Sequence, residues 1–144
     1  MIKCKKIKET AKLPIRGRDG DAGLDLFTAE ECILKPYETK AISTGLAIQI
    51  PYGMEGEIRP RSGISIYGLN GNYIHVIVST IDSNYRGEIH IIVYNSENKE
   101  IKIPLNTKLA QMVISNVVTD NLCFVDKLDE TNRGDNKFGS SGVK

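Results

Sequence analysis

Cysteine is scarce in this sequence, and the cysteines present form no pattern. There are three, Cys4, Cys32 and Cys123, which lie far apart and include no CxxC pair. A disulfide framework or a zinc site needs paired cysteines at regular spacing. The scarcity therefore argues against both and predicts reduced thiols in a cytoplasmic protein.

An excess of charge of one sign is also lacking. The formal net charge is +1 over 144 residues. Domains that bind nucleic acid usually concentrate a basic excess on one face, because they must neutralise phosphates. We therefore expect no nucleic acid among the partners of this protein.

Long hydrophobic runs are absent as well. No apolar run approaches the roughly 20 residues that cross a bilayer as a helix. Residues 1–8 are charged and lack the apolar core of a signal peptide. We expect no membrane partner and a cytoplasmic location, which for a phage or viral gene is the cytoplasm of the host.

Histidine is rare, and the common catalytic motifs are missing. His75 and His90 lie inside β-prone runs with no paired histidine or cysteine nearby. The order Ser-His-Asp, the HExxH motif and a cysteine–histidine pair are all absent. Both histidines are predicted to be structural, and we expect no metal site built by the protein alone.

What is present is a dense period-two pattern in a chain that fits one domain. Residues 41–50 carry their large apolar side chains on one face, and residues 73–78 and 88–94 have the β-branched composition of strands buried on both faces. Short strands separated by turns predict an all-β sandwich or barrel. Shorter β-prone segments follow at 100–103, 109–115 and 123–125, and turn signals stand at 51–53, 68–72, 95–98 and 104–106.

Helix is scarce. The best candidate is residues 62–67, where Ser62 could cap a short turn, although Gly63 and two β-branched isoleucines weaken it. Residues 132–144 are rich in glycine and serine, and this composition predicts a flexible C-terminal arm.

Asp82 is the first candidate for chemistry. It lies between two β-prone segments beside Ser83 and Asn84, which favour a turn, so an ordinary hairpin loop is one interpretation. Tyr85 and Arg86 follow at once, however, and put an aromatic ring and a permanent cation beside the carboxylate. A carboxylate at a hairpin tip can accept a proton from water, while the ring can pack on a sugar.

Two further segments could bind phosphate. In Pro60-Arg61-Ser62-Gly63 the guanidinium and hydroxyl are donors for phosphate oxygens, and glycine allows close approach; a capped helical turn is the alternative. Residues 133–142 combine glycines, hydroxyls and two cations with Phe138, which could stack on a base. The alternative for them is a disordered end.

Five segments in order resemble the motifs of the trimeric all-β deoxyuridine triphosphatase family, which are AGxDL, PRSG, GxIDxDYRG, RIAQ and RGxxGFGSTG. Each motif is weak alone, but five in order over residues 22–142 are specific. The matching segments are AGLDL at 22–26, PRSG at 60–63, STIDSNYRG at 79–87, KLAQ at 108–111 and RGDNKFGSSG at 133–142.

The resemblance implies a jelly-roll-like subunit, residues 1–144 as one domain with 132–144 as a mobile lid, and a homotrimer whose active sites are shared between neighbours. It implies hydrolysis of dUTP to dUMP and pyrophosphate with Mg²⁺ held mainly by the phosphates and water, Asp25 acting indirectly at most. Asp82 would activate the water, and Tyr85 would lie against the deoxyribose and exclude a 2′-hydroxyl. The remaining substrate-binding residues implied are Val78, Thr80 and Ile81 for uracil, Arg61, Ser62, Gly63 and Gln111 for phosphates, and Arg133, Phe138, Gly139, Ser140 and Ser141 in the lid.

The sequence departs from the family pattern at a few positions and leaves other functions open. Ser79 and Thr80 stand where glycine and valine are common, Asn84 replaces an acidic residue, and Lys137 replaces a glycine. These departures concern affinity and base selectivity more than catalysis. A dCTP-acting deaminase of the same fold, with Glu88 as its extra glutamate, and a non-catalytic nucleotide-sensing module are the alternatives, and a regulatory protein partner beside catalysis also stays open.

Overall fold

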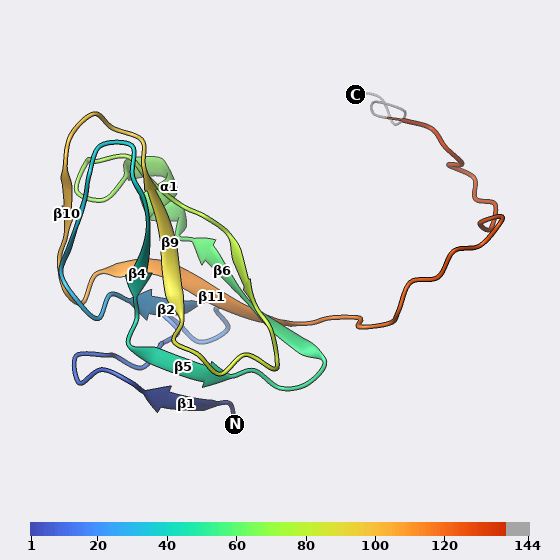
Figure 1. Ribbon diagram of the computed structural model, residues 1–144, viewed down its shortest axis with the longest axis horizontal. Coiled ribbons are helices and arrows are strands. Elements are labelled where there is room, and N and C mark those ends of the chain that lie inside the picture. Colours follow the sequence, from blue (N-terminus) through green and yellow to red (C-terminus); the bar gives the residue numbers. More distant parts are fainter. Residues whose placement is uncertain (138–144) are drawn as a thin grey trace.

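The computed structural model describes residues 1–137 and consists almost entirely of short strands around one core (Figure 1). The expectation of an all-β chain with very little helix is confirmed, and the sheets form an open, jelly-roll-like sandwich and do not close into a barrel. The elements are β1 (Lys3–Lys6), β2 (Leu24–Phe27), β3 (Cys32–Leu34), β4 (Thr39–Ser43), β5 (Leu46–Gln49), β6 (Met54–Pro60), α1 (Ser62–Tyr67), β7 (Ile74–Val76), β8 (Ser79–Ile81), β9 (His90–Asn95), β10 (Ile101–Ile103) and β11 (Lys108–Asn116).

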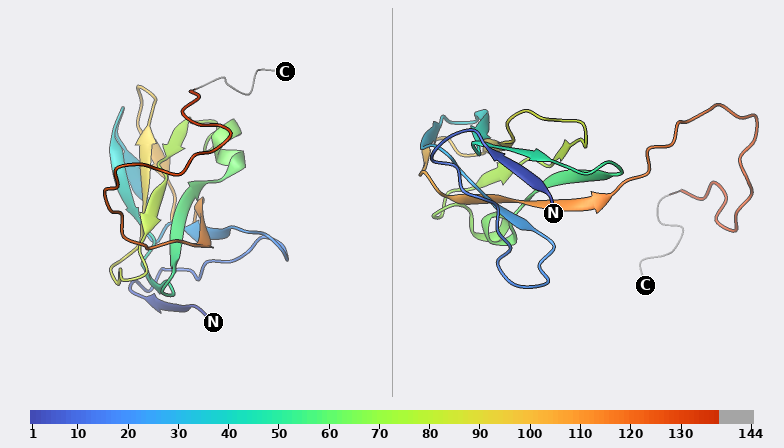
Figure 2. Two further views of the ribbon diagram at one scale, coloured as in Figure 1. Left: turned by 90° about the vertical axis from the view of Figure 1, so that its right-hand side faces the viewer. Right: turned by 90° about the horizontal axis from the view of Figure 1, so that it is seen from below.

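Two antiparallel sheets carry the structure. A four-stranded sheet has the order β2-β11-β6-β8, and a three-stranded sheet has the order β4-β9-β7. The longest ladder joins β11 to β6, from Ala110 opposite Pro60 to Asn116 opposite Met54. The pairs β1-β5 and β10-β3 extend the sandwich at its margins (Figure 2).

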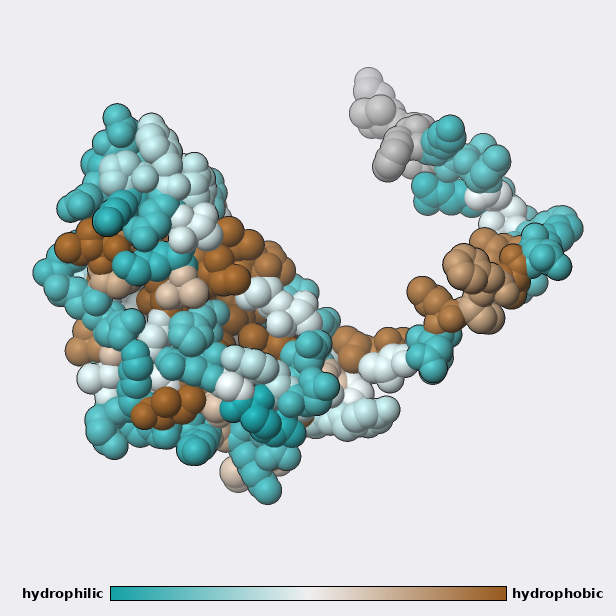
Figure 3. Space-filling model, in the orientation of Figure 1, coloured by the Kyte–Doolittle hydropathy of each residue, from teal (hydrophilic) through white to brown (hydrophobic). Residues whose placement is uncertain are grey.

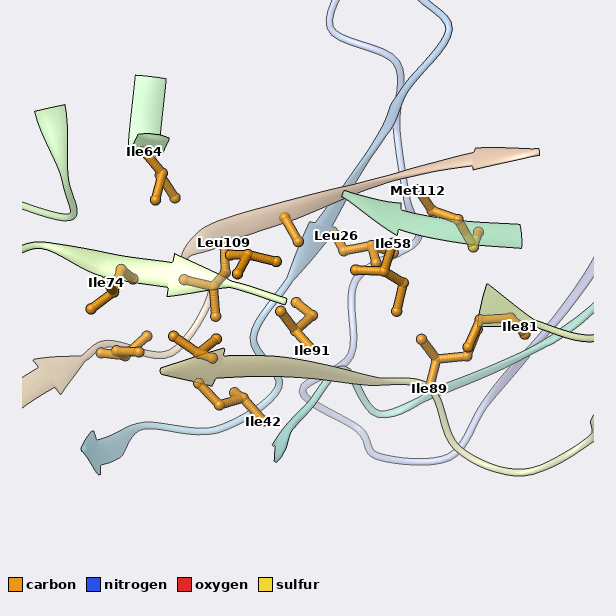
Figure 4. Packing of buried hydrophobic residues seen from close by; sticks show 14 of the residues in the cluster. Leu26, Ile42, Ile58, Ile64, Ile74, Ile81, Ile89, Ile91, Leu109 and Met112 are labelled. Carbon is orange, nitrogen blue, oxygen red and sulfur yellow. The ribbon is translucent and has the colours of Figure 1, made fainter. Parts of the chain in front are cut away.

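Isoleucine and leucine fill the space between the sheets (Figure 4). Along β9 the buried residues Ile91 and Val93 alternate with the half-buried His90, Ile92 and Tyr94. The predicted burial of residues 73–78 and 88–94 on both faces is therefore wrong. Only one face of this sheet meets the core, and the β-branched residues of the other face remain partly accessible.

The predicted strand over residues 41–50 is divided by the chain at Thr44 and Gly45. Gly45 has a φ of +67°, and a Cβ there would lie 2.8 Å from that of Ala11, so only glycine fits this bend. The buried Thr44 hydroxyl donates to the carbonyl oxygen of Ile89 at 2.6 Å. At this bend the chain leaves β4, a strand of the three-stranded sheet, and enters β5, which pairs with β1.

The C-terminal arm, here residues 117–137, leads away from the body after β11 (Figure 1). It contains no helix or strand, so the predicted strand at 123–125 is not formed. Its apolar side chains are exposed, among them Leu122 at 100% and Phe124 at 108% (Figure 3). Of the predicted lid, Phe138, Gly139, Ser140 and Ser141 lie outside the described residues.

The helix found is the expected one, residues 62–67, but Ser62 does not cap it. Arg61 is the N-cap residue, and no side-chain hydrogen bond is made there. Within residues 1–137 no helix is long and apolar enough to cross a membrane.

A matched pair of isoleucines in the sheet β10-β3 tests where the core lies. Ile101 is 1% exposed and Ile33 is 48% exposed. Replacing Ile101 by alanine removes packed methylenes and leaves a cavity, so we expect a loss of about 2–5 kcal/mol. Ile33→Ala should change stability by less than about 0.5 kcal/mol. Urea unfolding at one fixed protein concentration measures both, and equal losses would contradict this core.

Candidate functional site

The polar residues singled out in the sequence gather in two cavities. The first, called here the arginine cavity, has a volume of about 510 Å³ and lies beside the start of α1. The second, called the hairpin cavity, has a volume of about 300 Å³ and lies between β8 and β9. The two cavities share no lining residue.

Ion pairs fix the floor of the arginine cavity. Asp25 on β2 is 13% exposed in its side chain, and one carboxylate oxygen lies 2.9 Å from Nε of Arg61. The other oxygen lies 3.0 Å from Nζ of Lys108. Arg61 also donates from Nη1 to the Lys108 carbonyl oxygen at 3.1 Å. Two cations share one anion here, so the Arg61 guanidinium is held in place at the cavity, where such a group can bind phosphate.

The remaining wall of this cavity explains two glycines. Gln111 on β11 donates from Nε2 to the Pro60 carbonyl oxygen at 3.0 Å. A Cβ on Gly23 would overlap the Gln111 side chain, so glycine lets β2 lie beside it. Gly63 has open space around it, and with Ser62 it presents backbone and hydroxyl donors to the cavity.

A tight turn carries Asp82 at the rim of the hairpin cavity. The Tyr85 N–H donates to the Asp82 carbonyl oxygen at 3.1 Å and closes the turn. Arg86 donates from Nη1 to the carbonyl oxygens of Ser83 and Tyr85, each at 2.7 Å, and so fixes the backbone. The exposed Asp82 carboxylate and the Tyr85 ring, 43% exposed, both line the cavity. They can meet a ligand directly.

The hairpin cavity exists because the chain stops pairing with β9 after β7 and continues as β8 in the other sheet. β7 follows β9 as far as the hydrogen bond from Ile77 N–H to the Ile92 carbonyl oxygen at 2.9 Å. The chain then crosses to the other sheet, where β8 pairs with β6. β8 is the edge strand of that sheet, so one row of backbone groups in Ser79–Ile81 faces the opening and not a strand. Such a row can hydrogen-bond a planar heterocycle.

Ser79 adds an unusual feature beside this edge. Its hydroxyl oxygen is buried and has no hydrogen-bond partner among residues 1–137, an arrangement that costs roughly 1–3 kcal/mol. Thr80 and Ile81 line the same cavity, whereas Val78, 55% exposed, does not.

Glu88 and His90, which the motifs do not include, also line the hairpin cavity. The Glu88 carboxylate accepts hydrogen bonds from the Ser43 hydroxyl and from the Gly45 N–H. Partial burial raises the pKa of Glu88, but these bonds and the nearby His90 and Lys8 outweigh it and leave the pKa below its ordinary value. A carboxylate held in its charged form in this way is a poor proton shuttle, which disfavours the deaminase alternative.

The structure separates the predicted site residues into groups. Arg61, Ser62, Gly63 and Gln111 lie in the arginine cavity, and Thr80, Ile81, Asp82 and Tyr85 lie in the hairpin cavity. Arg133 is exposed on the arm and lines neither cavity. Among residues 1–137 no group of three or more His, Cys, Asp or Glu side chains could hold a metal ion.

Comparison with known sequences gives a consistent result. The family model described as dUTPase matches residues 9–142. The deoxyuridine 5′-triphosphate nucleotidohydrolase of Clostridium novyi (strain NT) is 46% identical over 138 residues, which cover 96% of this chain and 96% of that protein. The enzyme of the same description from Paramecium bursaria Chlorella virus 1 is 37% identical over 140 residues, again with 96% of each chain covered.

Solved structures agree. A variant of the Staphylococcus bacteriophage 80alpha dUTPase with dUpNHpp is similar with a TM-score of 0.91 at 27% identity, over 99% of each chain. A variant of the dUTPase from phage phi11 of S. aureus, described for its coordination of a structural Mg(II) ion, has a TM-score of 0.81 at 27% identity, over 88% of this chain and 97% of that one.

The lowered pKa of Glu88 predicts how the fold responds to acid. A carboxylate with a lowered folded pKa stabilises the fold above its ordinary pKa, and this stabilisation is lost as the pH falls through the lowered value. Glutamine cannot titrate. We therefore expect Glu88→Gln to be less stable than the wild type at neutral pH, with the difference shrinking in acid, as measured by urea unfolding at about pH 7 and about pH 3.

Glu31→Gln is the control for this prediction, because it removes an exposed carboxylate whose ion pair within residues 1–137 is with Lys102, at 2.9 Å, and which lines neither cavity. A stability difference for Glu88→Gln that stays constant between the two pH values would contradict the assigned shift.

Proposed function

This chain belongs to the dUTPase family and hydrolyses dUTP to dUMP and pyrophosphate, and we propose that Asp82 is the base that activates the attacking water. The reaction lowers the dUTP level and supplies dUMP for dTMP synthesis. The observation that carries the proposed role is the exposed Asp82 carboxylate beside Tyr85 at the rim of the hairpin cavity.

The proposed step is an in-line displacement at the α-phosphorus. Asp82 accepts a proton from water as the water oxygen bonds to the α-phosphorus, and the bond from that phosphorus to the bridging oxygen breaks. The electron pair leaves with pyrophosphate. The turn that Arg86 fixes would hold the carboxylate in place for this transfer.

Uracil and deoxyribose would occupy the hairpin cavity. The free edge of β8 at Thr80 and Ile81, with Val78 beside it, would read the polar edge of uracil through the backbone. The Tyr85 ring would lie against the deoxyribose and exclude a 2′-hydroxyl. The unpaired Ser79 hydroxyl stands beside this edge, where glycine is common in the family.

The triphosphate would occupy the arginine cavity with Arg61, Ser62, Gly63 and Gln111 as donors. Two carboxylates line this cavity, Asp21 and Asp25, and Asp25 is already paired with Arg61 and Lys108. This donor set fits Mg²⁺ bound mainly through phosphate oxygens and water, with Asp25 acting indirectly at most. Bound in this way, the ion would neutralise charge on the phosphates.

A homotrimer with shared active sites would join the two cavities. The residues proposed for base binding and those proposed for phosphate binding line cavities of one chain that have no residue in common, so a site completed by a neighbour is a direct solution. The exposed apolar side chains of the arm, and Ile77 at 41% on the outer face of β4-β9-β7, offer contact surface. Residues 132–144 would then close over the substrate as a lid of a single domain spanning 1–144, with Arg133 toward the phosphates.

The setting proposed is the cytoplasm, of a cell or of an infected host, because Cys4, Cys32 and Cys123 are free thiols. A regulatory protein partner would be an addition to catalysis and not a replacement, since Asp82 and Tyr85 are both accessible to a nucleotide.

Replacing Asp82 by asparagine removes the base and keeps the shape. We expect kcat on dUTP to fall by roughly 10²–10⁴-fold, while the imido analogue dUpNHpp still binds. Pyrophosphate release across dUTP, UTP, dTTP and dCTP, with and without Mg²⁺, measures this and tests whether dUTP is preferred. Asp120→Asn, on the arm and in neither cavity, is the control.

An Asp82→Asn protein that keeps its rate would refute the proposed base. Ammonia release from dCTP would favour the deaminase, and tight dUTP binding without turnover by the wild type would favour the non-catalytic module.

Shared sites can be tested by mixing two inactive variants. Asp82→Asn damages the hairpin cavity and Arg61→Ala the arginine cavity. In co-refolded trimers at equal ratio, about a quarter of shared sites receive both intact halves, so about that fraction of wild-type activity returns. Each variant alone is the control. A mixture as inactive as its components would contradict sharing.

A further inference from the structure

Glu88 contacts two parts of the molecule, one through its side-chain carboxylate and the other through its backbone carbonyl. Its carboxylate accepts from the Ser43 hydroxyl and, at 2.9 Å, from the N–H of Gly45, both at the bend between β4 and β5. Its backbone carbonyl accepts the Tyr85 hydroxyl at 2.9 Å and lies 3.1 Å from Nδ1 of His90. One residue therefore links the bend to the ring that lines the hairpin cavity.

Within residues 1–137, the hydrogen bond to the Glu88 carbonyl is the one that the Tyr85 side chain makes. The side chain is on the open side of the cavity, 43% exposed. A Cβ on Gly87 would overlap the Tyr85 hydroxyl, so the glycine lets the ring pass over residue 87 to reach the Glu88 carbonyl. An exposed ring has several accessible rotamers, and a hydrogen bond to a fixed acceptor selects one of them.

The acceptor is fixed in turn through the Glu88 side chain. Its carboxylate is 20% exposed and is held in the charged form by its donors. The next residue, Ile89, donates its N–H to the Leu46 carbonyl oxygen at 2.8 Å and so attaches to the far side of the same bend. On the Ile89 side the backbone is also held by the Thr44 hydroxyl, which donates to the Ile89 carbonyl oxygen. The carboxylate supplies the side-chain attachment on the Glu88 side, so without it the Glu88 carbonyl loses that restraint and can tilt.

We propose that Glu88 is a positioning residue that sets sugar discrimination by holding Tyr85 over the hairpin cavity. The inference rests on the proposed function, in which Tyr85 lies against the deoxyribose. Glu88 itself makes no bond to substrate in this scheme. Its loss lets the ring move outward and admits a 2′-hydroxyl, so selectivity between dUTP and UTP falls more than the rate on dUTP.

The test compares kcat/KM for dUTP and for UTP in the wild type, Glu88→Ala, Glu88→Gln and Tyr85→Phe. We expect Glu88→Ala to lower the dUTP-to-UTP ratio by roughly fivefold, which is about the effect of one lost hydrogen bond. Glu88→Gln keeps an acceptor oxygen for Ser43 and Gly45 and should retain most of the ratio. Tyr85→Phe should lower it by a similar factor, and the double variant Glu88→Ala, Tyr85→Phe should lower it little further.

Glu97→Ala is the matched control. Glu97 is also 20% exposed, its pKa is also lowered, by hydrogen bonds from Lys99 and the Tyr73 N–H, and it lines neither cavity. It should leave the ratio unchanged. A fall in both rates by the same factor in Glu88→Ala, an equal change in Glu97→Ala, or additive effects in the double variant would overturn the positioning role.

Failure of the inference and failure of the proposed function give different results. A wild-type protein that does not hydrolyse dUTP contradicts the function, whereas an active wild type with an unchanged ratio in Glu88→Ala contradicts only the inference. If Glu88→Ala does not fold, Ser43→Ala removes one donor to the carboxylate. A smaller fall in the same ratio then supports the role of Glu88, and no fall overturns it.

Discussion

The site depends on one constraint, which is that the chain leaves β9 after Ile77 and crosses to the other sheet. Up to the bond between Ile77 N–H and the Ile92 carbonyl oxygen, β7 and β9 form an ordinary antiparallel pair. Beyond it β8 belongs to the opposite sheet and pairs with β6. Backbone groups inside a sheet satisfy one another, whereas the free row of an edge strand beside an open cavity is available to water or to a ligand. The fold thus provides both an opening and backbone groups that can hydrogen-bond a flat polar ligand.

Charge is divided between the cavities in a way that suits one substrate. In the arginine cavity Asp25 neutralises part of the charge of Arg61 and Lys108 and sets the direction of the guanidinium. In the hairpin cavity the carboxylates of Asp82 and Glu88 differ in surroundings, since Asp82 is exposed and Glu88 accepts two hydrogen bonds. One carboxylate is left available for a proton, and the other is committed to structure.

Much of the fold follows from local pattern, and the exceptions have physical reasons. The turns near Gly53 and Asn106 and the long strand before Asn116 agree with local propensity. The period-two pattern does not reveal the break at Gly45, because the break is caused by the approach of Ala11, which is distant in the sequence. The pairing of β8 with the other sheet could not be predicted for a similar reason, because a change of sheet leaves the alternation of side chains intact.

The motif residues Asp82, Tyr85 and Arg61, which the sequence singled out, line the two cavities, whereas the contacts that hold them could not be predicted. The ion pair of Lys108 with Asp25 and the hydrogen bonds of Glu88 with Ser43 and Gly45 join residues far apart in the chain, so local sequence does not reveal them. The central claim, that the free edge of β8 receives the base, can be measured directly by amide hydrogen exchange at Ser79–Ile81 with and without dUpNHpp. The account predicts slower exchange there on binding, with Val93 of β9 unchanged; equal exchange with saturating analogue would contradict it.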